Sequence, residues 1–185
     1  VGLPFGTGGD LRRTLGIGQG VDDAIERLCT GRERLIDVGC VEHEGEQPGT
    51  TERRAFLNIA GGGLDGLVVR YVNRTSKALG GKLSFNWATV RALWDYDFPP
   101  IRVEVDGQLV SDEPSTFVAV ANGQFFGGGM HVAPEAALDD GLFDVVVARR
   151  ASFLRQFLNQ RDLYKGRHLR HPWYAFARGR EVRIA

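Results

Sequence analysis

The amino-acid sequence predicts an α+β protein, in which a short α/β segment precedes a strand-rich body that also contains helices. Three observations support this class. Apolar residues recur at helical spacing in several segments, apolar and polar residues alternate over 101–106 as in a half-buried strand, and glycines occur in clusters along the chain. Glycine accounts for 25 of the 185 residues, roughly twice its usual share of about 7%, and the absence of a Gly-X-Y period excludes collagen.

Charge and composition exclude several classes of protein. The 23 Lys and Arg residues balance the 23 Asp and Glu residues, so we expect no nucleic-acid partner. Hydrophobic residues make up 43% of the chain, an ordinary globular composition, and no apolar run is long enough to predict a membrane span. Cys29 and Cys40 are the two cysteines and form no CxxC motif, which favours a reducing, cytoplasmic setting.

The two ends of the sequence indicate a piece of a longer polypeptide. The chain begins with Val1 on what reads as the end of an apolar strand, and it closes on a second strand at residues 181–185. It also lacks the charged and apolar regions of a signal peptide. We therefore expect a fragment, with a processed or engineered start as the alternative.

The first 31 residues predict a glycine-rich turn followed by two helices. Asp10 is a candidate N-cap of the first helix, and Asp22 or Asp23 is a candidate N-cap of the second. Gly31 is a suitable residue to end the second helix.

The sequence pattern changes from helical to strand-like after residue 31. We expect strands at residues 35–41 and 55–60, with the polar segment 42–54 between them forming an exposed loop. Helical periodicity predicts helices over 64–72 and 83–94, which Pro99-Pro100 ends. The remaining predicted elements are strands at 101–105, 117–121, 143–148 and 182–184, a hairpin turn at Asp106-Gly107 and a helix at 153–158.

The first candidate site is Gly6-Thr7-Gly8-Gly9-Asp10, between a strand and a helix. Glycines let main-chain N–H groups approach an anion, and Arg12 or Arg13 could reach a phosphate. The segment matches neither a Walker A loop nor a GxGxxG fingerprint. It is therefore either a phosphate cradle or an ordinary turn.

Two further glycine-containing segments are candidate sites. Residues 122–134, NGQFFGGGMHVAP, fit a loop that lines a cavity or else a bulged hairpin. The paired carboxylates in 137–142, ALDDGL, fit an oxygen-rich Mg²⁺ or Ca²⁺ site or else an Asx-type turn. The basic segment 166–172 could meet anionic lipid head groups or phosphate, or it is a solvated loop.

Five segments, in order, carry a resemblance to a known family: GLPFGTGGDLRRTLG, RLIDVG, FLNIAGGGLDG, FVAVANGQFFGGGMHVAPEAALDDGLFDVVV and GRHLRHP. Along essentially its whole length the chain resembles the diacylglycerol-kinase-like lipid kinases, which include bacterial diacylglycerol kinases, YegS-type lipid kinases and sphingosine kinases. The resemblance implies the end of an α/β ATP-binding domain in residues 1–31. It also implies a β-sandwich-like lipid-substrate domain in residues 32–185, truncated at its C-terminus.

The resemblance also implies a function and a site. It implies transfer of the ATP γ-phosphoryl group to a lipid hydroxyl, such as that of diacylglycerol, with ATP and Mg²⁺ as cofactors. It further implies peripheral contact with a membrane. Independently of the resemblance, an exposed strand edge could pair two subunits into a homodimer. The implied catalytic residues are Asp10 and Asp37, in supporting roles. The implied nucleotide-binding residues are Gly6, Thr7, Gly8 and Arg13. The implied Mg²⁺ ligands are Asp140 and the main-chain carbonyls of Ala137 and Leu142. The implied lipid pocket comprises Gly63, Asp65, Phe125, Phe126 and Gly128.

The sequence departs from the family pattern at important points. Gly9 stands where the family's GTGND motif has Asn. The GGDGT loop would precede Val1, and the general-base Glu of the DGE motif would follow Ala185, so we expect residues 1–185 alone to be inactive. Asp106-Gly107-Gln108 is no substitute, because Gln cannot accept the proton. The alternatives are an NAD-kinase-like kinase of a soluble substrate and a non-catalytic lipid-binding module.

Overall fold

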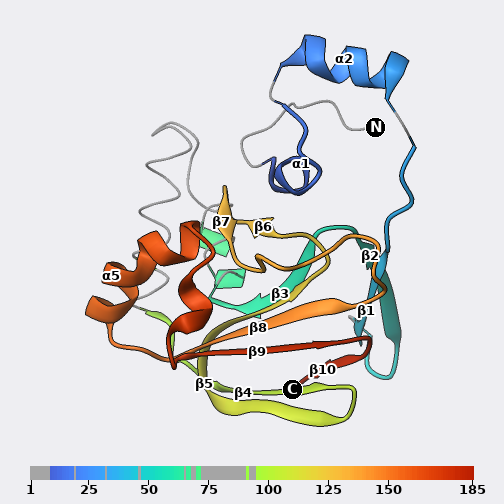
Figure 1. The fold of residues 1–185 in the computed structure, drawn as a ribbon. Helices are drawn as coiled ribbons and strands as arrows, with labels where there is room; N and C mark the ends of the chain where they lie inside the picture. Colours follow the sequence, from blue (N-terminus) through green and yellow to red (C-terminus); the bar gives the residue numbers. More distant parts are fainter. Residues whose placement is uncertain are drawn as a thin grey trace.

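The computed structural model describes residues 9–18, 20–31, 33–45, 47–64, 66–67, 70–71, 91 and 95–185 of the chain. Within these ranges the predicted α+β class is confirmed, because short helices accompany a larger set of strands (Figure 1). All the described strand pairs are antiparallel. No helix in the described part of the chain is long and apolar enough to cross a membrane.

The main sheet has six strands in the order β10-β4-β5-β8-β9, with β3 also paired to β5. The strands are β3 (Ile59–Gly63), β4 (Pro100–Val105), β5 (Gln108–Ala121), β8 (Phe143–Arg149), β9 (Tyr174–Gly179) and β10 (Val182–Ile184). The long strand β5 organises the sheet, because its first half pairs with β4 and its second half pairs with both β3 and β8. The predicted hairpin turn at Asp106-Gly107 is confirmed between β4 and β5, with φ angles of 49° and 80°.

The second half of β5 and strand β8 are buried on both faces. Successive strand residues point to opposite sides, so the two strands contribute to two separate apolar clusters. One cluster joins them to β4 through Val103, Val105, Val118, Val145 and Val147. The other faces the 132–136 segment and contains Ala119, Ala121, Val132, Ala133, Ala136 and Val146. Since β4 packs against the face of β8, the sheet folds over itself in a β-sandwich-like arrangement.

The segment predicted as an exposed loop, 42–54, instead forms most of a hairpin, so that prediction is wrong. Strands β1 (Gly39–Glu44) and β2 (Thr51–Phe56) pair antiparallel. Opposite charges face each other across the pair, and Arg53 Nη2 lies 2.6 Å from Glu42 Oε1. The glycine and proline residues that suggested a loop lie in the turn after β1. The strand expected at 35–41 begins only at Gly39, and the strand expected at 55–60 divides between β2 and β3.

The two N-terminal helices are confirmed, as is the predicted end of the second helix at Gly31, but the predicted N-caps are wrong. Helix α1 (Asp10–Thr14) has Gly9 as its N-cap and helix α2 (Val21–Thr30) has Gly20, and neither N-cap makes a side-chain hydrogen bond. Asp10, Asp22 and Asp23 lie in the first turns of their helices. Glycine takes the N-cap of α1 because this residue has a φ of 61°, which glycine adopts without steric cost.

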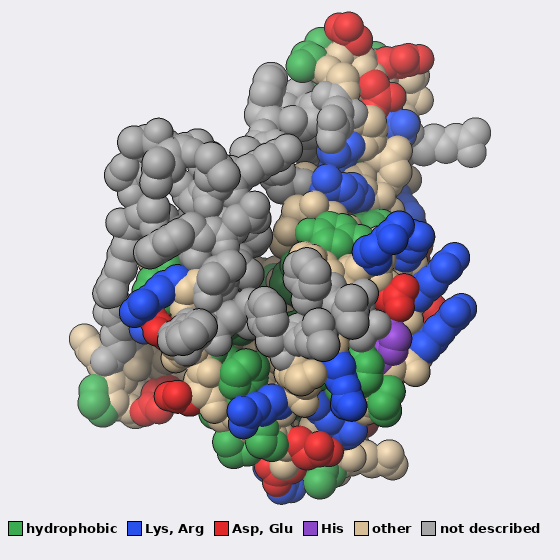
Figure 2. All heavy atoms as spheres, turned by 90° about the vertical axis from the view of Figure 1, so that its left-hand side faces the viewer, with side chains coloured by type: hydrophobic (Ala, Val, Ile, Leu, Met, Phe, Trp, Pro, Cys, Tyr) green, Lys and Arg blue, Asp and Glu red, His purple; other side chains and the backbone are tan. Residues whose placement is uncertain are grey.

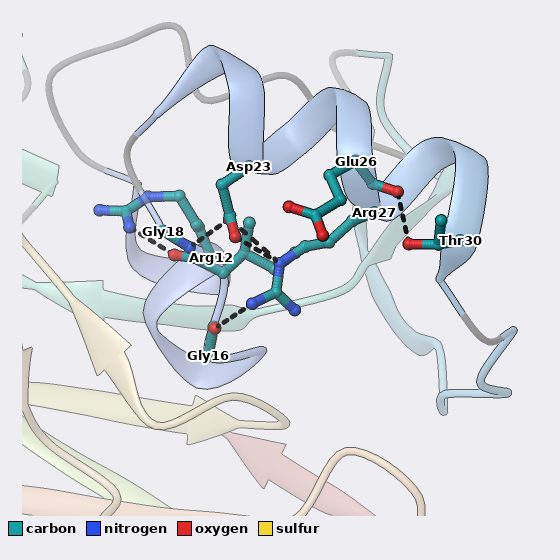
Figure 3. A network of polar contacts seen from close by, with 8 residues as sticks. Arg12, Gly16, Gly18, Asp23, Glu26, Arg27 and Thr30 are labelled. Carbon is teal, nitrogen blue, oxygen red and sulfur yellow. Dashed lines mark hydrogen bonds and ion pairs between the residues drawn. The ribbon is translucent and has the colours of Figure 1, made fainter.

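A polar network joins α2 to the turn after α1 (Figure 3). Asp23 accepts a hydrogen bond from the Gly18 main-chain N–H at 3.0 Å and pairs with Arg27 at 3.0 Å. Arg27 also donates to the Gly16 carbonyl at 3.5 Å. Asp23 therefore fixes the approach of the chain to α2, although it does not cap the helix.

The C-terminal third places α5 (Phe153–Tyr164) and a 3-10 helix (His168–Arg170) beside the main sheet (Figure 1). Helix α5 starts where predicted and extends six residues beyond the expected end at residue 158. Strand β10 is confirmed at the predicted residues. Of the predicted helix 64–72, the structure describes residues 64, 66–67 and 70–71, and they are helical. The predicted helix 83–94 lies outside the described part of the chain except for residue 91, which is helical.

Candidate functional site

A glycine turn joins two short strands in the 122–134 segment. Strands β6 (Phe125–Phe126) and β7 (Met130–His131) pair antiparallel, so this segment forms the hairpin that the sequence left as one of two possibilities. Its turn consists of Gly127, Gly128 and Gly129, which have φ angles of 61°, 87° and 110°. These left-handed conformations disfavour any residue with a side chain. We call residues 123–131 the glycine hairpin.

Helix α1 is attached to the glycine hairpin at two points. The main-chain N–H of Gly128 donates to Asp10 Oδ2 at 2.9 Å, and that of Gln124 donates to Thr14 Oγ1 at 3.0 Å. Asp10 Oδ1 pairs with Arg13 Nη1 at 2.6 Å. The structure therefore brings together Asp10, which was predicted as a supporting catalytic residue, Arg13, which was predicted at the nucleotide, and Gly128, which was predicted at the lipid pocket.

Thr14 is a contact that sequence reasoning missed. It lies four residues after Asp10, which places both side chains on one face of α1. That spacing was visible in the sequence, but its partner Gln124 is 110 residues away. The sequence therefore showed that Asp10 and Thr14 share a helix face, but only the tertiary fold showed that Thr14 contacts Gln124.

Two asparagines that the sequence analysis did not select tie several segments together. Asn122 is fully buried, and its Nδ2 donates to the carbonyls of Asp37 and Leu57, both at 2.9 Å. Asn58 Nδ2 donates to the Phe125 carbonyl at 2.9 Å, and the Asn58 carbonyl accepts from the N–H groups of Asn122 and Gly123. Asparagine within an apolar run was the available sequence signal. It indicates a buried polar group that needs partners.

Asp37 lies against the 137–142 turn. Its main-chain N–H donates to the Leu138 carbonyl at 2.6 Å, and its Oδ2 accepts from the Gly141 N–H at 2.7 Å. Arg34 pairs with Asp139 at 2.8 Å, which adds a second contact between the same two segments. The described contacts of Asp37 thus connect it to the predicted metal-binding turn, and none of these described contacts joins it to Asp10.

The 137–142 turn forms the predicted Asx-type turn, because Asp140 Oδ1 accepts from the Leu142 N–H at 3.0 Å. Asp140 Oδ2 forms an ion pair with Arg178, whose Nε lies 2.6 Å from Asp144 Oδ1. Asp144 is buried, and this burial raises its pKa while Arg178 opposes the shift. Each oxygen of Asp140 keeps a second lone pair, so these contacts leave the predicted metal site untested.

The described residues contain no cluster of three or more His, Cys, Asp or Glu side chains arranged to hold a metal. The predicted Mg²⁺ ligands would not form such a cluster, since two of the three are main-chain carbonyls. The Mg²⁺ site therefore stays a prediction.

The predicted pocket residues lie partly together. Gly63 pairs with Phe117 across β3 and β5, and the Phe117 ring lies 5.7 Å from the Phe126 ring, centroid to centroid. Phe125 stacks on His131 at 4.3 Å. Four predicted site residues lie outside the described residues: Gly6, Thr7, Gly8 and Asp65.

The basic segment 166–172 divides into a buried and an exposed part. His168 is fully buried, and its ring meets the Tyr174 ring edge-on at 4.7 Å. Burial lowers the pKa of His168 to about 4 and raises the pKa of Tyr174 to about 12. Arg167 and Arg170 remain exposed. The segment therefore combines a core residue with a charged surface.

Comparison with known proteins agrees with this architecture. Among curated proteins, the chain is 26% identical over 184 residues to a diacylglycerol kinase of Bacillus subtilis, with coverage of 98% of this chain and 57% of the relative. It is 29% identical over 142 residues to a probable lipid kinase YegS-like of Klebsiella pneumoniae, with coverage of 76% and 44%. A crystal structure of a diacylglycerol kinase from Bacillus anthracis superposes with a TM-score of 0.60 at 18% identity, covering 98% of this chain and 54% of that one.

The chain spans a little over half the length of the diacylglycerol kinases that it matches. Residues 58–185, which are more than half of the chain, match the YegS C-terminal NAD kinase beta sandwich-like domain. These matches confirm the resemblance to diacylglycerol-kinase-like lipid kinases, and the chain belongs to the YegS C-terminal NAD kinase beta sandwich-like domain family.

Proposed function

We propose that the protein carrying this chain is an ATP-dependent lipid kinase, which transfers the γ-phosphoryl group of ATP to the hydroxyl of diacylglycerol or a related lipid. The observation that carries the proposal is the bond from Gly128 to Asp10. It joins the helix expected at the nucleotide to the hairpin expected at the lipid. The names of the relatives from Bacillus subtilis and Klebsiella pneumoniae support the same class of reaction.

In this proposal, charged residues of α1 and the turn before it would hold the nucleotide. Gly6, Thr7 and Gly8 would place main-chain and hydroxyl donors near the phosphates, and Arg13 would supply positive charge. Such groups stabilise the negative charge that is spread over the phosphoryl oxygens during transfer. We expect the general-base Glu to lie beyond Ala185, so residues 1–185 alone should not catalyse the reaction.

The 137–142 turn would hold Mg²⁺. Carboxylate and carbonyl oxygens are the donors that Mg²⁺ prefers, and Asp140, Ala137 and Leu142 offer that set. Asp140 has a lone pair on each oxygen beyond its described bonds to the Leu142 N–H and to Arg178. A Mg²⁺ ion at this turn would supply positive charge and rigidity next to Asp37, which contacts the same turn.

Contact with an anionic membrane surface fits the charge of the α5 region. Arg161, Lys165, Arg167 and Arg170 are exposed. Asp162 is the one acidic residue in the 153–171 segment, and its Oδ2 lies 3.0 Å from Nε2 of His171. Figure 2 looks onto this side of the molecule, where basic side chains lie on the described surface together with acidic ones. Each exposed cation near an anionic membrane contributes about 1 kcal/mol of attraction.

A second candidate function is phosphorylation of a soluble substrate. The observation that favours it is the description of the matching domain as NAD kinase beta sandwich-like. A non-catalytic lipid-binding module is the third candidate, and the glycine at position 9 favours it by removing one side chain from the nucleotide site. A homodimer would use an open sheet edge, for which β10 at the end of the main sheet is the candidate.

The test is ATP turnover by the complete protein with diacylglycerol in mixed micelles, compared with a sphingoid base, with NAD in lipid-free buffer and with empty micelles. Turnover that requires one lipid supports the proposal and identifies its acceptor. Turnover with NAD and without lipid would support the second candidate. Lipid binding without any turnover, in folded protein that binds Mg-ATP, would support the binding module.

A further inference from the structure

The two contacts between α1 and the glycine hairpin have a geometry that suits coupling a movement of α1 to a movement of the hairpin. Asp10 and Thr14 are one helical turn apart. They accept hydrogen bonds from Gly128, in the turn of the glycine hairpin, and from Gln124, near its start. One bond would let the hairpin pivot about it. Two bonds fix its direction relative to the helix, so a displacement of α1 must move the hairpin.

The hairpin itself is adaptable. Its turn is made of three consecutive glycines, and a Cβ added at Gly128 would meet no atom within 4 Å. Glycine backbones move between conformations without the steric barriers of other residues. The bonds to α1 therefore restrain the direction of the turn, together with the short β6–β7 pairing and the bonds of Asn58 to Gly123 and Phe125.

The charge arrangement supplies a way to change this restraint. Asp10 shares its carboxylate between Arg13 on one oxygen and the Gly128 N–H on the other. The Arg13 guanidinium also lies beside the turn, since a Cβ at Gly129 would be 3.4 Å from its central carbon. A phosphate bound near α1 would compete with Asp10 for Arg13. The charge of Asp10 would then act more strongly on the Gly128 N–H.

We infer that α1 couples nucleotide binding to lipid binding, with Thr14 as a positioning residue that keeps the glycine hairpin in register with the helix. This inference rests on the proposed function, and it adds that the two substrates bind cooperatively. Nucleotide binding strengthens the hydrogen bond between Asp10 and the Gly128 N–H, and this bond restrains the hairpin that carries Phe125 and Phe126. Coupling between two sites in proteins typically changes affinity by 5- to 150-fold, and we expect about 5- to 10-fold here because few bonds carry it.

The test measures the affinity of the complete protein for dioctanoylglycerol in detergent micelles, with and without saturating Mg²⁺ and AMP-PNP. The wild type should bind the lipid about 5- to 10-fold more tightly with the nucleotide analogue present. Thr14→Val removes the hydroxyl and should reduce this factor to about one, while each affinity measured alone changes less than about threefold. Thr14→Ser keeps the hydroxyl and should restore the coupling.

Thr30→Val is the matched control, because Thr30 is exposed on α2 and its hydroxyl donates to the Glu26 carbonyl of the same helix. It should leave the coupling unchanged. If Thr14→Val does not fold, Thr14→Ala removes the same hydroxyl with less bulk. Hydrogen exchange of residues 123–131 in the wild type provides a readout without any variant, since AMP-PNP should slow exchange there.

The outcomes separate this inference from the function on which it rests. Independent binding of the two ligands by the wild type, full coupling in Thr14→Val, or unchanged hydrogen exchange in 123–131 would each overturn the inference and leave a lipid kinase intact. A wild type that binds neither AMP-PNP nor dioctanoylglycerol would overturn the proposed function, and the inference with it.

Discussion

The buried His168 makes the stability of the protein depend on pH in a calculable way. The side chain is fully buried, and burial lowers its pKa from 6.5 to about 4. The main chain of Val132 and the charge of Asp162 oppose this shift, whereas His131 and His171 add to it. The unfolded chain therefore binds one more proton than the folded protein between pH 6.5 and pH 4.

The sign and size follow from linkage. Stability from the neutral His168 is fully present above pH 6.5 and is lost as the pH falls through this window. The shift corresponds to about 3 kcal/mol of unfolding free energy in total, of which about 2 kcal/mol is lost by pH 5. A loss of this size is a large part of the stability of an ordinary domain.

The assay is urea unfolding followed by circular dichroism at pH 8, 7, 6 and 5, on the wild type and on His168→Gln. Glutamine does not titrate, so the variant should lose about 2 kcal/mol less than the wild type between pH 8 and pH 5, whatever its stability at pH 8. His43→Gln is the control, because His43 is exposed on β1. It should keep the wild-type pH dependence. Equal pH dependence in the wild type and His168→Gln would refute the reasoning.

Three further predictions follow from the sites described above. Millimolar Mg²⁺ should raise the Tm of the wild type by a few degrees through preferential binding to the folded state. This increase should disappear in Asp140→Asn and persist in the neighbouring Asp139→Asn, and an increase that persists in both would exclude the turn as the metal site. Arg167→Glu should weaken sedimentation with phosphatidylglycerol vesicles about tenfold at low salt, whereas Arg183→Glu on β10 should not, and equal losses would point to net charge alone. Asn122→Leu should lower the unfolding free energy by about 1–3 kcal/mol, because two main-chain carbonyls lose their buried donor, and unchanged urea unfolding would contradict that role.

Local patterns predicted the elements whose conformation is decided locally. The Asp106-Gly107 turn and the alternation in β4 needed no distant partner, and both are confirmed. The β1–β2 hairpin was missed because its strands are polar and mostly exposed, so the main-chain pairing and the charge pairs across it, such as Glu42 with Arg53, leave no apolar alternation in the sequence.

The sequence predicted individual residues of the candidate site better than it predicted the contacts between them. Asp10 and Gly128 were both selected from the sequence, yet the bond between them spans 118 residues. Thr14 and Asn122 were not selected, because a hydroxyl on a short helix or an amide in an apolar run has many ordinary uses. Their partners are main-chain groups, which carry no sequence signal, so only the fold could identify them.

The distinction between Asn122 and Thr14 affects how loss of activity near the glycine hairpin should be interpreted. Asn122 is buried and holds the carbonyls of Asp37 and Leu57, so its loss should lower stability and activity together. Thr14 makes one bond to a single hairpin residue, Gln124. Its loss should change the dependence of lipid binding on nucleotide more than it changes stability. A residue that links two sites is therefore recognised here by a change in coupling in a protein that remains folded, since loss of activity alone would not separate it from a residue that supports the core.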